Sequence, residues 1–185
     1  MSQNCPLHPN SLSPEKAVLL VVDLQTAFAA AIPEFSELVN RASVMVRGCK
    51  LLGIPVAATE QVPAKLGSTA EPLRAVLADI TPIEKTIFSA YPAAASQLKD
   101  RSQIILCGIE THICINQTAH DLLAAGMQVH LLVDAIGSRF PHDREAGLNK
   151  MFKAGAIPST VELALFEMMR DSKHEHFRAI QKLVK

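Results

Sequence analysis

Three residues of chemically reactive type stand far apart in the sequence, namely Asp23, Lys85 and Cys114. Cys114 follows the apolar run 104–107 and a short polar turn, and it lies near the start of segment 112–126, whose apolar residues have helical spacing. The first turn of a helix offers unpaired N–H groups and a partial positive charge, and thiol pKa values fall there. We therefore expect a lowered pKa for the Cys114 thiol, as a nucleophile requires.

The other two residues could complete this nucleophile. Lys85 would add a positive charge nearby, and Asp23 could accept the thiol proton and return it to a leaving group. The backbone N–H of Cys114, with one from the preceding turn, could bind a developing oxyanion. Each residue also has a plain structural interpretation: Cys114 can fill the core, Asp23 can cap a strand end, and Lys85 can be solvated. Residue types and spacing alone leave both interpretations open.

The elements that must position these residues alternate along the chain. Short apolar runs predict strands at 17–24, 54–60, within 82–90, at 103–110, 128–137 and 156–161. Helical spacing predicts helices at 35–53, 71–80, 92–100, 112–126, 141–155, 161–171 and 174–185. This order predicts a single α/β domain over 1–185, doubly wound around a mainly parallel sheet, with residues 1–14 as a polar N-terminal extension. Ligands bind at the carboxyl ends of such strands, where the three reactive residues could meet.

Composition narrows the classes of function. The 185 residues include 18 Lys plus Arg and 18 Asp plus Glu, so the net charge is zero and we expect no nucleic-acid partner. The longest apolar run, 17–22, is too short to span a bilayer, so we expect no membrane partner. The start of the chain lacks the pattern of a secretory leader, and we expect a cytoplasmic protein without disulfides. A mitochondrial location stays open, although no clear transit peptide is visible.

Cofactor motifs are absent from the sequence. The cysteines at positions 5, 49, 107 and 114 form no CxxC pair, and His174 and His176 are spaced so that a helix would not place them on one face. No G-x-G-x-x-G follows a predicted strand, so dinucleotide binding is unsupported. We therefore expect neither a metal nor a cofactor.

Three segments together resemble the isochorismatase-like cysteine hydrolases: VVDLQTAF (21–28), EKTIFSAY (84–91) and CGIETHICINQTAHDLLAAGMQVHLLVDA (107–135). The resemblance extends from about Lys16 to Met169. It is greatest to the metal-free branch named isochorismatase domain-containing proteins, in which the second strand region reads like ATEQVPAKLG (58–67). It implies a three-layer, Rossmann-like domain with a six-stranded parallel sheet.

The resemblance also assigns roles to residues. It implies a catalytic triad of Asp23, Lys85 and Cys114, and a cis peptide between Ile109 and Glu110. The oxyanion hole would then consist of the backbone N–H groups of Glu110 and Cys114. Related nicotinamidases bind a metal through an Asp and His cluster after the second strand, whereas segment 59–65 contains no histidine here. A homo-oligomer, either a dimer or a tetramer, is expected from the resemblance.

These observations favour a hydrolase that acts on a small amide or acyl compound through a covalent thioester. One alternative is a binding or scaffold protein that retains the reactive cysteine; another is a ribonuclease or RNA-associated protein. Candidate contacts to the small-molecule substrate follow Asp23, end the second predicted strand, or precede Cys114 in the turn. They are Gln25, Phe28, Glu60, Gln61, Thr111 and His112, of which Phe28 could equally be core and His112 could equally cap the turn.

Overall fold

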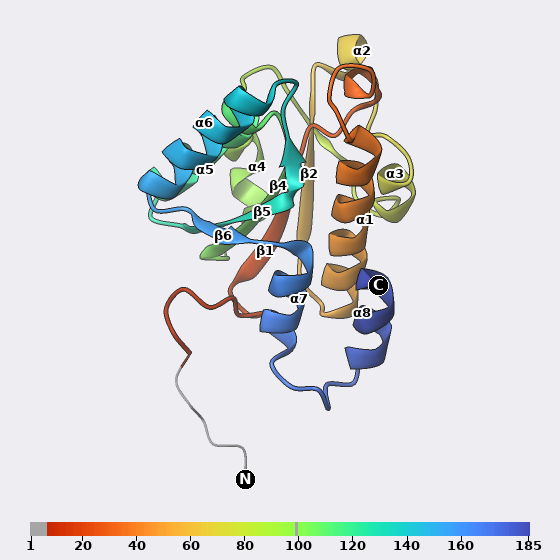
Figure 1. The fold of residues 1–185 in the computed structure, drawn as a ribbon, viewed down its shortest axis with the longest axis vertical. Helices are drawn as coiled ribbons and strands as arrows, with labels where there is room; N and C mark the ends of the chain where they lie inside the picture. The colour runs from red at the N-terminus through yellow and green to blue at the C-terminus, as the bar shows by residue number, and fades with distance from the viewer. Residues whose placement is uncertain (1–6, 99) are drawn as a thin grey trace.

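The computed structural model describes residues 7–98 and 100–185, which form a three-layer α/β domain (Figure 1). Six strands form one sheet in the order β3-β2-β1-β4-β5-β6, and every pairing is parallel. The strands are β1 (Ala17–Val22), β2 (Val56–Gln61), β3 (Ile83–Lys85), β4 (Gln103–Ile109), β5 (Gln128–Gly137) and β6 (Ile157–Ser159). The predicted fold class, a doubly wound domain with a six-stranded parallel sheet, is confirmed.

Helices cover both faces of the sheet. One layer contains α1 (Phe35–Leu51), α3 (Leu73–Val76), α7 (Val161–Met169) and α8 (Phe177–Val184). The opposite layer contains α4 (Tyr91–Leu98), α5 (Asn116–Ala124) and α6 (Pro141–Lys153). A short 3-10 turn, η1 (Thr26–Phe28), contacts the one-turn helix α2 (Pro63–Leu66). Neither of these short elements was predicted, and the helix predicted at 71–80 is the single turn α3.

The core is centred on the two middle strands. Every residue of β1 and of β4 is buried, which explains why both read as continuous apolar runs. Gly108 near the end of β4 has a φ of 125°, and a Cβ added there would lie 2.0 Å from the carbonyl oxygen of Val22. Only glycine allows β1 and β4 to approach this closely at their carboxyl ends.

The predicted N-terminal extension is only partly described. Its first six residues lie outside the described residues. The remainder is attached to the sheet, because Leu12 is fully buried and the Ser13 amide donates a 2.8 Å hydrogen bond to Gln103 Oε1. Among the described residues, no helix is long and apolar enough to cross a membrane.

Candidate active site

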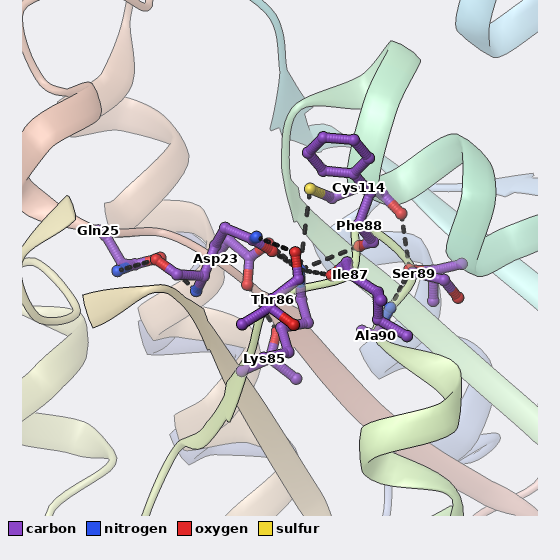
Figure 2. Close-up of polar contacts among 12 residues, drawn as sticks. Asp23, Gln25, Lys85, Thr86, Ile87, Phe88, Ser89, Ala90 and Cys114 are labelled. Atoms are coloured by element: carbon purple, nitrogen blue, oxygen red, sulfur yellow. Dashed lines mark hydrogen bonds and ion pairs between the residues drawn. The ribbon is translucent and has the colours of Figure 1, made fainter. Parts of the chain in front are cut away.

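The predicted reactive residues meet at the carboxyl ends of the middle strands. The strand order reverses between β1 and β4, and loops leaving such a switch point open a crevice for ligands. Asp23 directly follows β1, Lys85 ends β3, and Cys114 lies in the turn after β4. Figure 2 shows the side chains of these residues grouped together. The topology thus brings together three residues that are up to 91 positions apart in the sequence.

Lys85 is buried and ion-paired, so it is not a solvated lysine. Its Nζ lies 2.6 Å from Asp23 Oδ2, and both side chains are only 1% exposed. The same Nζ donates to Gln61 Oε1 at 2.6 Å and to the backbone oxygens of Phe88 at 2.9 Å and Ile87 at 3.3 Å. A buried ammonium needs partners of this kind to offset its lost hydration. Strand pairing of Gln61 with Lys85 fixes the cation opposite Asp23.

The Asp23 carboxylate keeps one oxygen available for proton transfer. Its Oδ1 accepts a 2.8 Å hydrogen bond from Thr59 Oγ1. Its Oδ2 contacts the Lys85 ammonium but receives no well-aligned hydrogen bond from the described residues. A buried oxygen in this state is uncommon in native structures. Asp23 Oδ2 can therefore accept a proton from a group that faces it.

The Cys114 thiol faces this ion pair. Its Sγ lies 3.8 Å from Lys85 Nζ, and the residue is 8% exposed. The pKa of the thiol is raised to about 12, mainly by burial and also by the charge of Asp23 and a hydrogen bond to it. The Lys85 charge and a hydrogen bond from the Glu110 backbone act in the opposite direction. The expectation of a lowered pKa is wrong, because burial outweighs the effect of the helix start. The thiol is neutral at rest.

The turn that carries Cys114 is a π-helical turn, Thr111–Ile115, that precedes α5. The peptide bond between Ile109 and Glu110 is cis. The Glu110 carboxylate accepts hydrogen bonds from Arg139 N at 3.1 Å and Arg139 Nε at 3.0 Å. The backbone of Glu110, in contrast, hydrogen-bonds the sulfur. This arrangement places an amide donor at the nucleophile, while the carboxylate is paired with Arg139.

A cavity of about 170 Å³ opens in front of the thiol. Its walls are mainly apolar, and they include the reactive residues Asp23 and Cys114. The lining residues are Asp23, Phe28, Gln61, Leu66, Phe88, Ile109, Glu110, Ile113 and Cys114. Two of the predicted substrate contacts, Phe28 and Gln61, are in this set.

The other four predicted contacts lie outside the lining set, and all of them except Thr111 have polar partners of their own. The Gln25 side chain bridges to the backbone of Gln61 and Gly67, and Glu60 accepts two hydrogen bonds from Thr69. Thr111 is fully buried. His112 Nδ1 lies 3.0 Å from Ser138 Oγ, and its Nε2 lies 3.8 Å from Asp143 Oδ2. The structure therefore places Gln25, Glu60 and His112 in contacts that brace the site.

Sequence reasoning missed Thr59, which orients Asp23, and most of the cavity wall. Phe88 could have been found from the sequence, since it lies within the segment EKTIFSAY. In the structure its aromatic side chain is half exposed. Among residues 7–98 and 100–185, no group of three or more His, Cys, Asp or Glu side chains could hold a metal ion.

Comparison with known proteins places this geometry in a family. The model of the isochorismatase domain matches residues 17–162, and the chain belongs to the isochorismatase family. Isochorismatase domain-containing protein 2A of Mus musculus is 42% identical over 175 residues, covering 93% of this chain and 84% of the relative. The corresponding protein 2 of Danio rerio is 38% identical and covers 94% and 89% of the two chains.

A solved structure agrees closely with the fold. The MAR1 ribonuclease of Caenorhabditis elegans superposes with a TM-score of 0.90 at 38% identity, covering 94% of this chain and 92% of that one. Family membership supports a hydrolase. The substrate and the roles of the individual residues are not given by these similarities.

Proposed function

We propose that the protein is a cysteine hydrolase of a small amide or acyl compound that acts through a thioester on Cys114. The observation that carries this proposal is the grouping of three side chains at one cavity: the Cys114 thiol and the Asp23 carboxylate, which both line it, and the buried Lys85 ammonium, which contacts Asp23 and lies 3.8 Å from the sulfur. A thiol that only fills the core requires neither a proton acceptor nor a cavity.

The proposed acylation begins with a neutral thiol. Cys114 Sγ attacks the substrate carbonyl carbon while the thiol proton moves to Asp23 Oδ2, so no free thiolate accumulates. Lys85 keeps Asp23 oriented and stabilises the negative charge that develops on sulfur. The oxyanion accepts hydrogen bonds from the backbone N–H groups of Glu110 and Cys114. Collapse of the tetrahedral intermediate breaks the bond to the leaving group, which takes the proton from Asp23.

Deacylation runs the same proton path again. Asp23, ionised once more, accepts a proton from water as the water oxygen attacks the thioester carbonyl. The second tetrahedral intermediate collapses to a carboxylic acid product, and the proton returns from Asp23 to Cys114 Sγ. The Thr59 hydrogen bond to Oδ1 and the Lys85 contact at Oδ2 keep the carboxylate in place through both steps.

The first test is hydrolysis of a panel of short amides and esters by the wild type, Cys114→Ala and the matched control Cys107→Ala. Cys107 is also buried, with its pKa raised to about 12 by burial, but it does not line the cavity. We expect Cys114→Ala to lose more than about a thousandfold in kcat/KM and Cys107→Ala to keep most of it. Hydroxylamine should trap the acyl group on the wild type. Turnover by folded Cys114→Ala would refute the mechanism.

A second candidate function comes from the name of a relative, since the C. elegans protein at 38% identity is called a ribonuclease. A phosphodiester carries a negative charge, whereas no lysine or arginine is among the described residues that line this cavity, and the nearby Lys85 is already paired with Asp23. Cleavage of labelled RNA by the wild type, abolished in Cys114→Ala, would favour this function. RNA binding that weakens steeply with increasing salt concentration would also favour the ribonuclease function.

The binding or scaffold alternative predicts a different pattern. Cys114 would react with electrophiles, yet no member of the amide and ester panel would turn over.

A homo-oligomer, either a dimer or a tetramer, is also proposed. Large apolar side chains such as Ile87, Phe140 and Leu163 are about half exposed on the single chain. Light scattering of the purified protein measures the number of subunits directly.

A further inference from the structure

The cavity beside Cys114 limits the part of a substrate that can enter. Its volume of about 170 Å³ is close to the ~150 Å³ of an apolar cavity that holds one benzene molecule. An acyl group of about six to eight non-hydrogen atoms would fill it. The Cys114 thiol is the attacking group, so the substrate carbonyl must lie at Cys114 and the remainder of the acyl group must lie against the other, mainly apolar lining residues.

The wall offers hydrophobic contact in several directions. Five of the lining residues are apolar, and they come from the η1 turn, α2, the loop after β3, β4 and the π-helical turn. They are Phe28, Leu66, Phe88, Ile109 and Ile113. Figure 2 shows Phe88 next to Cys114. Burial of an apolar group against such a wall is favourable at about 25 cal/mol per Å².

The polar groups of the lining are already committed to partners inside the protein. The Asp23 carboxylate is paired with the ammonium of Lys85, which is outside the lining set. Gln61 uses Oε1 for Lys85 and donates from Nε2 to Thr86 O at 2.7 Å. The Glu110 carboxylate is held by Arg139. Among the described residues, no lining side chain is left with an unbalanced positive charge.

A charged acyl group would therefore be penalised in this cavity. A carboxylate or phosphate that entered would lose its hydration without gaining a cation, and the Asp23 carboxylate would repel it. An uncharged apolar group loses nothing comparable. This difference between charged and uncharged acyl groups arises from the lining of the cavity, and it does not depend on which bond is cleaved.

We propose that the substrate is an amide or ester of a small, uncharged, apolar carboxylic acid, such as a short branched or aromatic acid. This inference rests on the proposed function. Acids that carry a second carboxylate or a phosphate on the acyl side are excluded. Leu66 and Phe88 are the main specificity residues, because both line the cavity and are less buried than Ile109, so they form its outer part.

The test uses a pair of reagents that differ in charge but alkylate through the same carbon. Iodoacetamide is neutral and iodoacetate is anionic. Their rates at Cys114 are measured by mass spectrometry and divided by their rates at the same cysteine in the urea-unfolded chain. We expect the folded protein to favour iodoacetamide by at least about tenfold beyond the unfolded ratio. Equal or reversed preference would overturn the proposal.

A charge placed in the wall should change this preference. Leu66→Lys puts an ammonium at the cavity, and its matched control Ser68→Lys puts one on an exposed residue outside the lining set. We expect Leu66→Lys to shift the ratio toward iodoacetate by about tenfold or more and Ser68→Lys to leave it near the wild-type value. A shift of the same size in both variants would mean that surface charge, not the wall, sets the preference.

Turnover separates this proposal from the proposed function. Butyramide and benzamide should be hydrolysed in preference to succinamate, whose acyl group ends in a carboxylate. Faster hydrolysis of succinamate would overturn the substrate class but leave the cysteine hydrolase intact. If no amide or ester turns over while the alkylation preference and its reversal in Leu66→Lys persist, the hydrolase proposal fails and the inference about the cavity stands.

Discussion

The two ends of the parallel sheet bury polar side chains in different ways. At the carboxyl ends, Asp23 and Lys85 are buried as charges beside a cavity. At the amino ends, Gln103, Gln128 and His130 are linked as neutral groups: Gln103 Nε2 donates to Gln128 Oε1 at 2.6 Å, and His130 Nε2 lies 3.1 Å from the same oxygen.

The amino-end cluster has a visible structural task. Gln103 bonds the backbone of Ser11 and Ser13, and Gln128 Nε2 donates to Pro9 O at 2.9 Å, so the cluster fastens residues 9–13 to the sheet. Its groups are neutral and satisfied, as buried structural polar groups usually are. The carboxyl-end cluster retains two charges and an oxygen without an aligned hydrogen bond. Buried charge beside a cavity therefore distinguishes the candidate active site from the amino-end cluster within one sheet.

The largest effect that tests this contrast is expected from Asp23→Asn. The variant loses the proposed general base, so kcat/KM should fall about 10²- to 10⁴-fold. The charge of Asp23 and the hydrogen bond to it raise the pKa of the Cys114 thiol, so their removal should lower that pKa. Iodoacetamide should then alkylate Cys114 faster at pH 8 than it does in the wild type. Turnover and thiol reactivity would move in opposite directions.

The pH profile of alkylation tests whether Asp23→Asn lowers the pKa of the Cys114 thiol. In the wild type, the rate at Cys114 should keep rising up to at least pH 10, because the pKa is raised to about 12. In Asp23→Asn the curve should move to lower pH, while the curve for Cys107 should not move. Circular dichroism controls for folding, since Lys85 loses its buried partner. A wild-type thiol that ionises near pH 7 would contradict the assignment of a neutral resting thiol.

At the amino ends of the strands, a change of pH should alter the stability of the protein but not its catalysis. Burial lowers the pKa of His130 from 6.5 to about 4, and the residue is 1% exposed. Between these values the unfolded chain binds the proton and the folded chain does not, so the free energy of unfolding falls as pH drops from about 6.5 to 4. The loss should be about 3 kcal/mol.

Urea unfolding of the wild type, His130→Gln and the control His142→Gln measures this contribution. His142 is 78% exposed at its side chain, so its replacement should leave the pH dependence nearly unchanged. The difference in unfolding free energy between wild type and His130→Gln should shrink or reverse by about 3 kcal/mol from pH 7 to pH 4. A difference that stays constant across this range would show that His130 carries no buried neutral state.

The convergence of Asp23, Lys85 and Cys114 was predictable because strand alternation fixes which residues end strands, and parallel strands place those ends at one edge. The raised pKa of the Cys114 thiol could not be predicted, because the sequence gives the start of the helix but not how deeply the thiol is buried. The cavity wall was equally inaccessible: Leu66 and Phe88 come from α2 and a loop, whose positions depend on tertiary packing. His112 lies in a π-helical turn, and the 3.6-residue period does not describe which way its side chain points.

The smallest expected effect concerns Thr59, which connects the fold to the chemistry. Its Oγ1 donates the only side-chain hydrogen bond that the described residues give to Asp23 Oδ1, at 2.8 Å. Thr59→Val keeps the shape and removes the donor. A hydrogen bond to a charged group contributes about 1.5 kcal/mol, so kcat should fall about tenfold with KM little changed. Thr69→Val, which removes a donor to Glu60 outside the cavity, is the matched control and should retain kcat. If both variants lose kcat equally, the loss reflects general loosening of this end of the sheet; if only Thr59→Val does, the orientation of the Asp23 carboxylate limits the proton transfer.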